Sequence, residues 1–541
     1  MAPDQPRLTR RALLAAGVTA AAAAVTPWRR FLETGPKLEG SVLGPAHAFA
    51  HRLRGGGFPS VSDTRRVGVV IVGGGAAGLS AAWRLGRAGF DDFELLELDR
   101  ETGGNARWGT GPSGAYPWGA HYLPLPDKGS TLVVEVLREF GAVTGSDAAG
   151  RPVFEERHLC HAPEERLYSQ GRWESGLFPR AGASEDDLAQ WARFQARMEG
   201  FRRLKTSDGR PAFSVPMERS SRDAELLALD RLSMAGWLAR EGFTSERVLW
   251  LADYACRDDF GARAAGTSAW AGLHYWASRE AEARVLTWPE GNGWLVERLR
   301  APVAARVRTG ALAFRVEETP EGVEVDYVDG AKGDAHRLLA KAAVFCAPRF
   351  TAARVVPALA REAAVTAAFQ YAPWMTANLE LEDAPSGRGA DLAWDNVLYK
   401  SDSLGFVDAG HQRMGPGSRR SVWTYFRPFP DGDPAANRAA MLARSWDDWK
   451  ADVFADLGRA VPGLERSARK LDVWLWGHGM VRPAPGFMFG PERALAGAPR
   501  GRLFFGHSDL SGFSLFEEAQ YRGVRAAEAA LKRLGKKAEV L

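Results

Sequence analysis

The hydrophobic pattern is clearest in residues 67–98. A strongly apolar run from Val67 to Val72 predicts a buried strand, and an amphipathic run after a glycine-rich turn predicts a helix. A second apolar strand ends at Glu97. The order of strand, turn, helix and strand is typical of a parallel βαβ unit, so we expect an α/β fold with a Rossmann-like domain.

The glycine turn between the first strand and the helix has the spacing of a dinucleotide-binding loop. Gly73 permits a tight turn, Gly75 lets the backbone approach a pyrophosphate, and Gly78 lets the helix pack closely against the sheet. Glu97 can accept hydrogen bonds from a ribose diol. A purely structural bend is the alternative, but the flanking elements and the acid favour a nucleotide site. The residues expected to bind the nucleotide are Gly73, Gly75, Ala76, Ala77, Gly78 and Glu97.

The pattern changes several times along the rest of the chain, which predicts a discontinuous nucleotide-binding domain with an inserted substrate domain of α+β character. Helix-like segments at 188–204, 224–241 and 438–458 and a strand at 374–381 belong to the insertions. A β-meander near 312–330 and a final strand and helix at 502–534 belong to the nucleotide domain. The predicted boundaries are 29–66 for a lead-in, 67–126, 286–350 and 472–535 for the nucleotide-binding domain, and 127–285 and 351–471 for the substrate domain.

Composition narrows the class of protein. The chain has 541 residues, which is too long for one hydrophobic core, and its 45% hydrophobic and 25% charged content is that of a globular protein. A net charge of +4 gives no case for nucleic-acid binding. The 19 tryptophans are numerous, and we expect most of them in cores or domain interfaces and some in an apolar substrate cleft.

Residues 1–28 resemble a twin-arginine export signal. Arg10 and Arg11 precede paired leucines and an alanine-rich run that ends at Val25 and is too short for a stable membrane span. A basic helical start to an ordinary domain is the alternative. The signal predicts recognition by the twin-arginine export machinery and an exported or periplasmic protein. Because that machinery carries folded proteins, it suits a chain that acquires a nucleotide cofactor before export.

The sequence predicts no metal site. Three cysteines give no disulfide framework, and no cysteine–histidine cluster has zinc spacing. We interpret His158 to His161 as a surface loop and the adjacent acids Asp258 and Asp259 as a solvated loop. His274 lies among apolar residues and is expected to be a core histidine.

Two further segments resemble the flavin-dependent amine oxidase and phytoene desaturase superfamily. Gly103-Gly104-Asn105 with Arg107 is similar to the segment that contacts the pyrophosphate of FAD in that family, and Trp118-Gly119-Ala120-His121 is similar to the one that approaches the flavin ring. The resemblance implies that Ala313 lies in the strand beside the adenine and that Ala347 ends a buried strand of the same domain. It also implies that residues from Gly506 to Glu517 approach the flavin. The cofactor-binding residues implied in this way are Gly103, Gly104, Asn105, Arg107, Gly119, Ala120, His121, Ala313, Ala347, Gly506, Asp509, Phe516 and Glu517.

The chain departs from the family where amines are recognised. The strand at 374–381 lacks the lysine that many amine oxidases place near the flavin, and His507 replaces an acid, so Asp509 becomes the candidate ligand of the ribityl chain. The side chains expected near the flavin face are His121, Tyr122, Trp476 and His478, the four candidate catalytic residues, together with His507 and Phe513.

Three functional hypotheses follow. The preferred one is an exported FAD-dependent oxidoreductase that oxidises a C–N bond of an amine, possibly a polyamine, by hydride transfer to flavin N5. A desaturase or isomerase that acts on C–C bonds of an apolar substrate is the second, and a non-catalytic flavoprotein that binds a partner is the third. The substrate is a small molecule, while its identity, the electron acceptor and the oligomeric state stay open.

Overall fold

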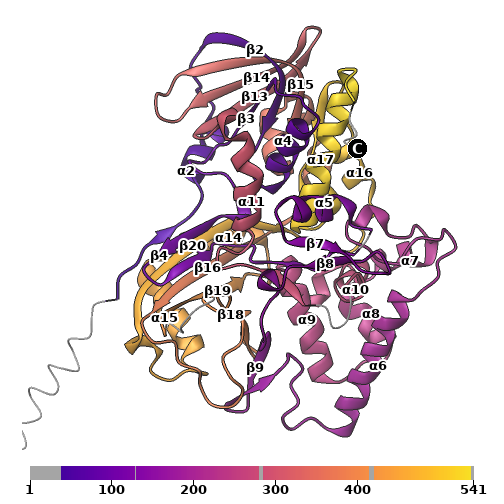
Figure 1. Cartoon of the computed structure of the whole chain (residues 1–541), viewed down its shortest axis with the longest axis vertical. Helices are drawn as coiled ribbons and strands as arrows, with labels where there is room; N and C mark the ends of the chain where they lie inside the picture. The colour runs from indigo at the N-terminus through magenta and orange to yellow at the C-terminus, as the bar shows by residue number, and fades with distance from the viewer. Residues whose placement is uncertain (1–37, 128, 280–283, 414–418, 538–541) are drawn as a thin grey trace, which may run out of the picture.

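The computed structural model describes residues 38–127, 129–279, 284–413 and 419–537. It has an upper lobe around a seven-stranded sheet and a lower lobe around an eight-stranded sheet, with a bundle of helices beside the lower sheet (Figure 1). The mixed α/β fold predicted from the sequence is confirmed. The twin-arginine motif lies outside the described residues.

The upper lobe is built on the predicted βαβ unit. Its parallel strands follow the order β12, β3, β2, β15, β21, and the helices α4 and α17 pack together beside them. The close contact depends on Gly523, since a Cβ there would clash with the backbone of Ala77. The bounds are β2 Val61–Val72, α4 Ala76–Arg87, β3 Phe93–Leu96, α11 Gly293–Arg300, β12 Val307–Arg308, β15 Ala335–Phe345, β21 Leu503–Phe505 and α17 Phe516–Arg533.

A meander extends the same sheet. β13 (Ala311–Thr319) and β14 (Gly322–Asp329) pair antiparallel, and β14 pairs with the long β15. Alternating apolar side chains from these strands form a separate small core. The meander predicted near 312–330 is therefore present.

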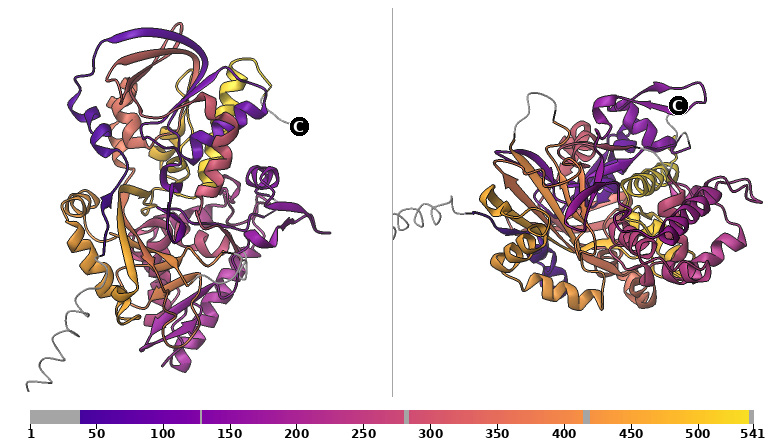
Figure 2. Two further views of the ribbon diagram at one scale, coloured as in Figure 1. Left: turned by 60° about the vertical axis from the view of Figure 1, so that its left-hand side comes forward. Right: turned by 90° about the horizontal axis from the view of Figure 1, so that it is seen from below.

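The lower lobe has a sheet that draws strands from most of the chain, in the order β1, β20, β16, β19, β18, β17, β9, β10. The helices α14 (Pro434–Leu442) and α15 (Trp446–Leu457) cover one face, and a bundle of helices from residues 185–277 lies on the other side (Figure 2). The strands are β1 Val42–Leu43, β20 Ala468–Val481, β16 Tyr371–Leu381, β19 Ser421–Pro428, β18 Gly405–Asp408, β17 Asp395–Leu398, β9 Glu165–Ser169 and β10 Arg172–Ser175.

The helical bundle shows where the predicted helices break. Residues 224–241 form α7 (Ala224–Ala228) and α8 (Met234–Arg240) rather than one helix, because Ser233 adopts an extended conformation and caps α8. Residues 438–458 are likewise divided by Ser445, which opens α15 with a capping box. The other bundle helices are α6 Glu185–Arg202, α9 Glu246–Phe260 and α10 Ala269–Ala277.

Two predicted domain boundaries are wrong. β2 begins at Val61, inside the predicted lead-in, because it continues along β15 well before the glycine turn. Residues 472–481 belong to the lower sheet, since β20 is one continuous strand paired with β16. The lead-in contributes β1 to the edge of that sheet, parallel to β20.

His274 is a core histidine, as predicted. It is buried, its Nε2 lies 2.8 Å from the carbonyl oxygen of Ser214, and its ring stacks on Phe513 at 4.6 Å between centroids. Phe513 is fully buried in this bundle core, so it is not on an open flavin face as expected from the sequence. Burial lowers the pKa of His274 to about 3.

This histidine makes stability depend on pH. The unfolded chain binds a proton near pH 6.5 that the native protein excludes, so the free energy of unfolding falls as the pH drops from about 6.5 toward 3. We expect His274→Phe to cost about 1 kcal/mol at pH 7.5 through the lost hydrogen bond. Between pH 7.5 and 5 it should then lose less stability than the wild type in urea unfolding. An equal loss in both proteins would contradict this.

Candidate functional site

Two glycine segments face each other at the carboxyl ends of β2 and β3. The Gly103 N–H donates to the Gly74 carbonyl at 2.8 Å, and Gly75 and Gly103 form an isolated bridge. A Cβ on Gly78 would clash with the Gly73 carbonyl, whereas a Cβ on Gly75 would meet nothing closer than Gly104 Cα at 3.8 Å. We call Gly73–Gly78 with Gly103–Gly104 the glycine cradle. It exposes backbone and the start of α4 with no side chain larger than that of Ala76, which suits phosphate binding.

Glu97 borders the cradle. Its carboxylate accepts hydrogen bonds from the Gly74 N–H at 2.6 Å and the Asp99 N–H at 2.7 Å, while burial raises its pKa to about 7. The backbone of Glu97 also pairs with Arg308 and Ala311, which brings the Ala313 strand alongside. The structure thus assembles the predicted ribose acid, the glycine turn and the adenine strand in one place.

Arg107 is engaged by the protein. Its guanidinium pairs with Asp99 at 2.6 Å and with Glu101 at 3.4 Å, and it lies 5.0 Å from the ring centroid of Trp474. The guanidinium of Arg107, which the resemblance places against a pyrophosphate, is therefore paired with the Asp99 carboxylate in this structure. The neighbouring Asn105 donates instead to the Gly479 carbonyl on β20, which ties the cradle to the lower lobe.

The Gly119-Ala120 segment lies on the cradle. The Ala120 N–H donates to the Asn105 carbonyl at 2.8 Å, and any side chain at Gly119 would clash with that carbonyl. Trp476 donates from Nε1 to the Trp118 carbonyl at 2.7 Å. The two predicted cofactor segments are therefore held together by backbone contacts.

The C-terminal segment closes the upper lobe. Ala347 follows β15 directly, and Gly506 donates to the Phe345 carbonyl at 2.9 Å. Phe516, at the start of α17, packs in the core of the upper lobe. Glu517 is buried beside Arg279, and burial raises its pKa to about 7.

Asp509, the residue predicted to bind the ribityl chain, has several partners within the protein. Its carboxylate accepts hydrogen bonds from the Tyr371 hydroxyl and the Arg349 N–H and lies 2.9 Å from His507 Nδ1. It is 2% exposed. These partners hold the Asp509 carboxylate inside the protein, whereas His507 is half-buried.

The four candidate catalytic residues form two groups. His121 stacks on Phe426 at 4.5 Å and lies near Trp394, with Tyr122 beside it, and the Trp476 ring is 5.4 Å from Trp474 on the same side of the lower sheet. Burial lowers the pKa of His121 to about 4, so its imidazole is neutral at pH 7. His478 instead stacks on Phe350 at 4.1 Å and packs against Tyr371, next to Asp509.

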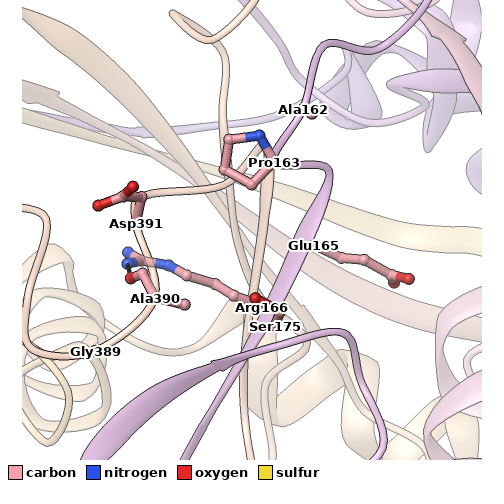
Figure 3. A pocket seen from close by; sticks show the side chains of 8 residues that line it. All are labelled: Ala162, Pro163, Glu165, Arg166, Ser175, Gly389, Ala390 and Asp391. Carbon is pink, nitrogen blue, oxygen red and sulfur yellow. Dashed lines mark hydrogen bonds between the residues drawn. The ribbon is translucent and has the colours of Figure 1, made fainter.

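The sequence missed a group of acids near Tyr122. Glu165 and Asp395 are register partners on the parallel strands β9 and β17, so their side chains share one face of the lower sheet. Asp395 pairs with Val407 on β18, and Val407 pairs with Thr424 on β19, so these side chains lie on the same face of the sheet. In Figure 3 Glu165 points away from Arg166, which lies toward Asp391 in an open pocket of about 480 Å³.

Asp258 joins these acids from the helical bundle. It lies near the end of α9, four residues after Tyr254, so the prediction of a solvated loop at 258–259 is wrong. Asp259 is buried and pairs with Arg279 at 3.4 Å. We call Glu165, Asp258, Asp395, Tyr122, Tyr254 and Tyr275 the acid–tyrosine cluster. The i, i+4 pair of Tyr254 and Asp258 was the only signal of it in the sequence.

The charges of this cluster act on one another. Burial, followed by the charge of Asp259, raises the pKa of Asp258 to about 7. Desolvation, followed by the charge of Glu164, also raises the pKa of Glu165, but this residue is exposed at the open pocket, so solvent screens the effect. Burial and the charges of Asp258 and Glu165 raise the pKa of Asp395. Among the described residues, Arg279 is the one cation that lowers the pKa of several members, and it is already paired with Asp259.

The His158–His161 segment is not the surface loop predicted. Cys160 is fully buried, and His158 Nδ1 accepts a hydrogen bond from Trp288 Nε1 at 2.9 Å. Across the described ranges, no three His, Cys, Asp or Glu side chains lie close enough to hold a metal ion. In the same part of the chain no helix has the length and apolar character to cross a bilayer.

Known proteins share the Rossmann-like domain and the overall fold of this chain. Residues 71–140 match the NAD(P)-binding Rossmann-like domain. The chain superposes on a putrescine oxidase bound to putrescine, with TM-score 0.64, 18% identity, and coverage of 87% of this chain and 100% of the other. Cyclohexylamine oxidase from Brevibacterium oxydans gives TM-score 0.61, 16% identity, and coverage of 87% and 99%.

A third similar structure is a fatty acid isomerase from P. acnes that produces CLA, with TM-score 0.61, 14% identity, and coverage of 86% and 98%. No curated protein sequence matches the chain. The resemblance drawn from the motifs is thus confirmed at the level of the fold. That fold accommodates both amine oxidation and fatty acid isomerisation in the similar proteins.

Proposed function

We propose that the protein is a FAD-dependent oxidoreductase that oxidises a C–N bond of an amine. The observation that carries the proposal is the acid–tyrosine cluster beside His121. The charge of Glu165 contributes to the raised pKa values of both Asp258 and Asp395, so a bound cation stabilises this group of carboxylates, and the surrounding aromatic rings add favourable contacts with an ammonium group. The cluster therefore selects a positively charged organic substrate.

The residues present fit FAD. Gly75 and Gly104 would face the diphosphate, Glu97 the ribose, and the start of α17 the flavin edge where its dipole favours negative charge. When bound, the flavin supplies N5 as the hydride acceptor. The aromatic side chains near His121 exclude water, and its neutral imidazole can accept a hydrogen bond from an amine N–H without repelling a cation.

Oxidation or isomerisation of an apolar substrate is the second candidate. The fold shared with a fatty acid isomerase and the aromatic bundle core favour it. The acid–tyrosine cluster opposes it, because an apolar chain would desolvate the carboxylates without offering a charge or a donor in return. A flavoprotein that only binds a partner would bind FAD but never reduce it.

Spectroscopy of the purified full-length protein tests the proposal. We expect a yellow protein whose flavin absorbance is bleached under anaerobic conditions by 1,4-diaminobutane or butylamine and not by a polyunsaturated fatty acid. Bleaching by the fatty acid alone would favour the second candidate. A colourless protein that takes up no FAD would refute the cofactor assignment itself.

We also propose export through the twin-arginine pathway. The motivating observation is the Arg10-Arg11 pair before a weakly apolar run. Cell fractionation of the full-length chain and of an Arg10→Lys/Arg11→Lys variant tests it, and the same distribution of both proteins would contradict it.

A further inference from the structure

Basic side chains from four parts of the fold meet where the two lobes join. The lead-in helix α2 (His47–Ala50) lies at this junction, as do α14 and β20 (Figure 1). α2 is followed by α3 (Arg52–Gly55), which contacts α12 (Arg349–Val355). We call the group the cationic seam. Its members are His47, His51, Arg54, Arg354, Arg438 and His478.

The arginines of the seam form no ion pairs within the described residues. Among the residues that the structure describes, the side chains of Arg54 and Arg354 form no hydrogen bond or ion pair, and the Arg438 side chain donates only to the Gly477 carbonyl at 3.1 Å. Burial and the charges of Arg438 and Arg54 lower the pKa of His478 to about 3. Two carboxylates lie near. Asp433 caps the N-terminus of α14, the helix that carries Arg438, and Asp509 is held by Tyr371 and His507.

The seam adjoins the glycine cradle at both ends. At one end the Ala46 N–H donates to Asp99 Oδ2 at 3.1 Å, and Asp99 in turn contacts Glu97 and Arg107. At the other end Gly479, next to His478, accepts the Asn105 hydrogen bond. Arg107, the cation within the cradle, is neutralised by Asp99 and Glu101. Uncompensated positive charge therefore lies beside the cradle rather than in it.

We propose that the cationic seam binds a phosphate group. Guanidinium groups without counter-ions offer charged, forked donors to phosphate oxygens, and a multiply charged anion relieves their mutual repulsion. Arg438 and His478 are half-buried between the lobes, so a compact anion fits the seam better than an extended surface such as nucleic acid. The phosphate belongs either to the diphosphate of the dinucleotide, which rests on the proposed function, or to a free phosphate-bearing ligand.

A charge-matched pair of double variants tests the seam. Arg54→Gln/Arg438→Gln removes two seam cations, and Arg138→Gln/Arg231→Gln removes two exposed arginines from helices elsewhere. In the holoenzyme we would measure the rate of FAD release by flavin fluorescence. We would also measure the rise in melting temperature caused by inorganic phosphate at constant ionic strength.

Faster FAD release of about 10-fold in the seam variant alone supports the proposal with the cofactor diphosphate as ligand. Loss of the phosphate-induced shift in melting temperature in the seam variant alone supports it with a free phosphate as ligand. If the two variants behave alike in both measurements, the proposal is overturned. Bleaching of the wild-type flavin by amines is measured separately. A failure of the proposed function can therefore be distinguished from a failure of the seam to bind phosphate.

Discussion

A Gly75→Val variant is expected to fold normally and to lose its flavin. Gly75 has φ −74° and ψ −173°, which any residue can adopt, and a Cβ there meets only Gly104 Cα at 3.8 Å. The added side chain would fill the glycine cradle, where a diphosphate would otherwise contact the backbone. We expect FAD affinity to fall by about 100-fold, or about 2.7 kcal/mol, with an unchanged melting temperature of the apoprotein.

The matched control is Gly200→Val, because Gly200 on α6 has no atom near the position of an added Cβ. It should keep both FAD and fold. By contrast, Gly78→Ala should destabilise the protein itself, since its Cβ would clash with the Gly73 carbonyl. Normal FAD binding by Gly75→Val would show that the cradle does not hold the cofactor.

Asp258→Asn is expected to reduce kcat/KM for a diamine by about 10- to 100-fold, mainly through KM. The substitution keeps the shape but removes a negative charge from the acid–tyrosine cluster, and a charge-assisted contact contributes about 1.5–3 kcal/mol. Because the pKa of Asp258 is about 7, its charge develops as the pH rises through 7. Wild-type kcat/KM should therefore rise with pH in that range, and the variant should show a weaker rise.

Steady-state kinetics with a diamine and with butylamine measure this effect. Asp447→Asn is the control, because Asp447 is 77% exposed and pairs only with Lys450 on the surface of α15. If Asp258→Asn and Asp447→Asn have the same kcat/KM and pH profile, the acid–tyrosine cluster does not bind the substrate.

The glycine turn and the acid of the candidate cofactor site could be predicted from the sequence because they lie close together along the chain. The spacing from Gly73 to Glu97 determines a strand, a turn, a helix and an acid within one βαβ unit, and the structure assembles them as expected. The segments at Gly103 and Gly119 were recognisable for the same reason, since backbone contacts with that unit fix their glycines.

The acid–tyrosine cluster could not be predicted from the sequence. Glu165 and Asp395 meet only through the register of β9 and β17, and α9 brings Asp258 to them from the bundle. A single acid in a short strand or a helix does not change the hydrophobic periodicity of the sequence. The adjacent acids Asp258 and Asp259 therefore favour a solvated loop when the sequence is considered alone. Likewise, the pairing of Arg107 with Asp99 and the enclosure of Asp509 by Tyr371 depend on tertiary contacts.

The most direct test of the central claim is anaerobic mixing of the full-length holoenzyme with 1,4-diaminobutane and with its form deuterated on the carbons next to nitrogen. If this protein takes a hydride from the carbon that bears the amine, deuteration should slow flavin bleaching several-fold, and an amino aldehyde should form. Flavin that is not bleached by the diamine, or bleaching at the same rate with both forms and without an aldehyde, would contradict the proposed C–N oxidation.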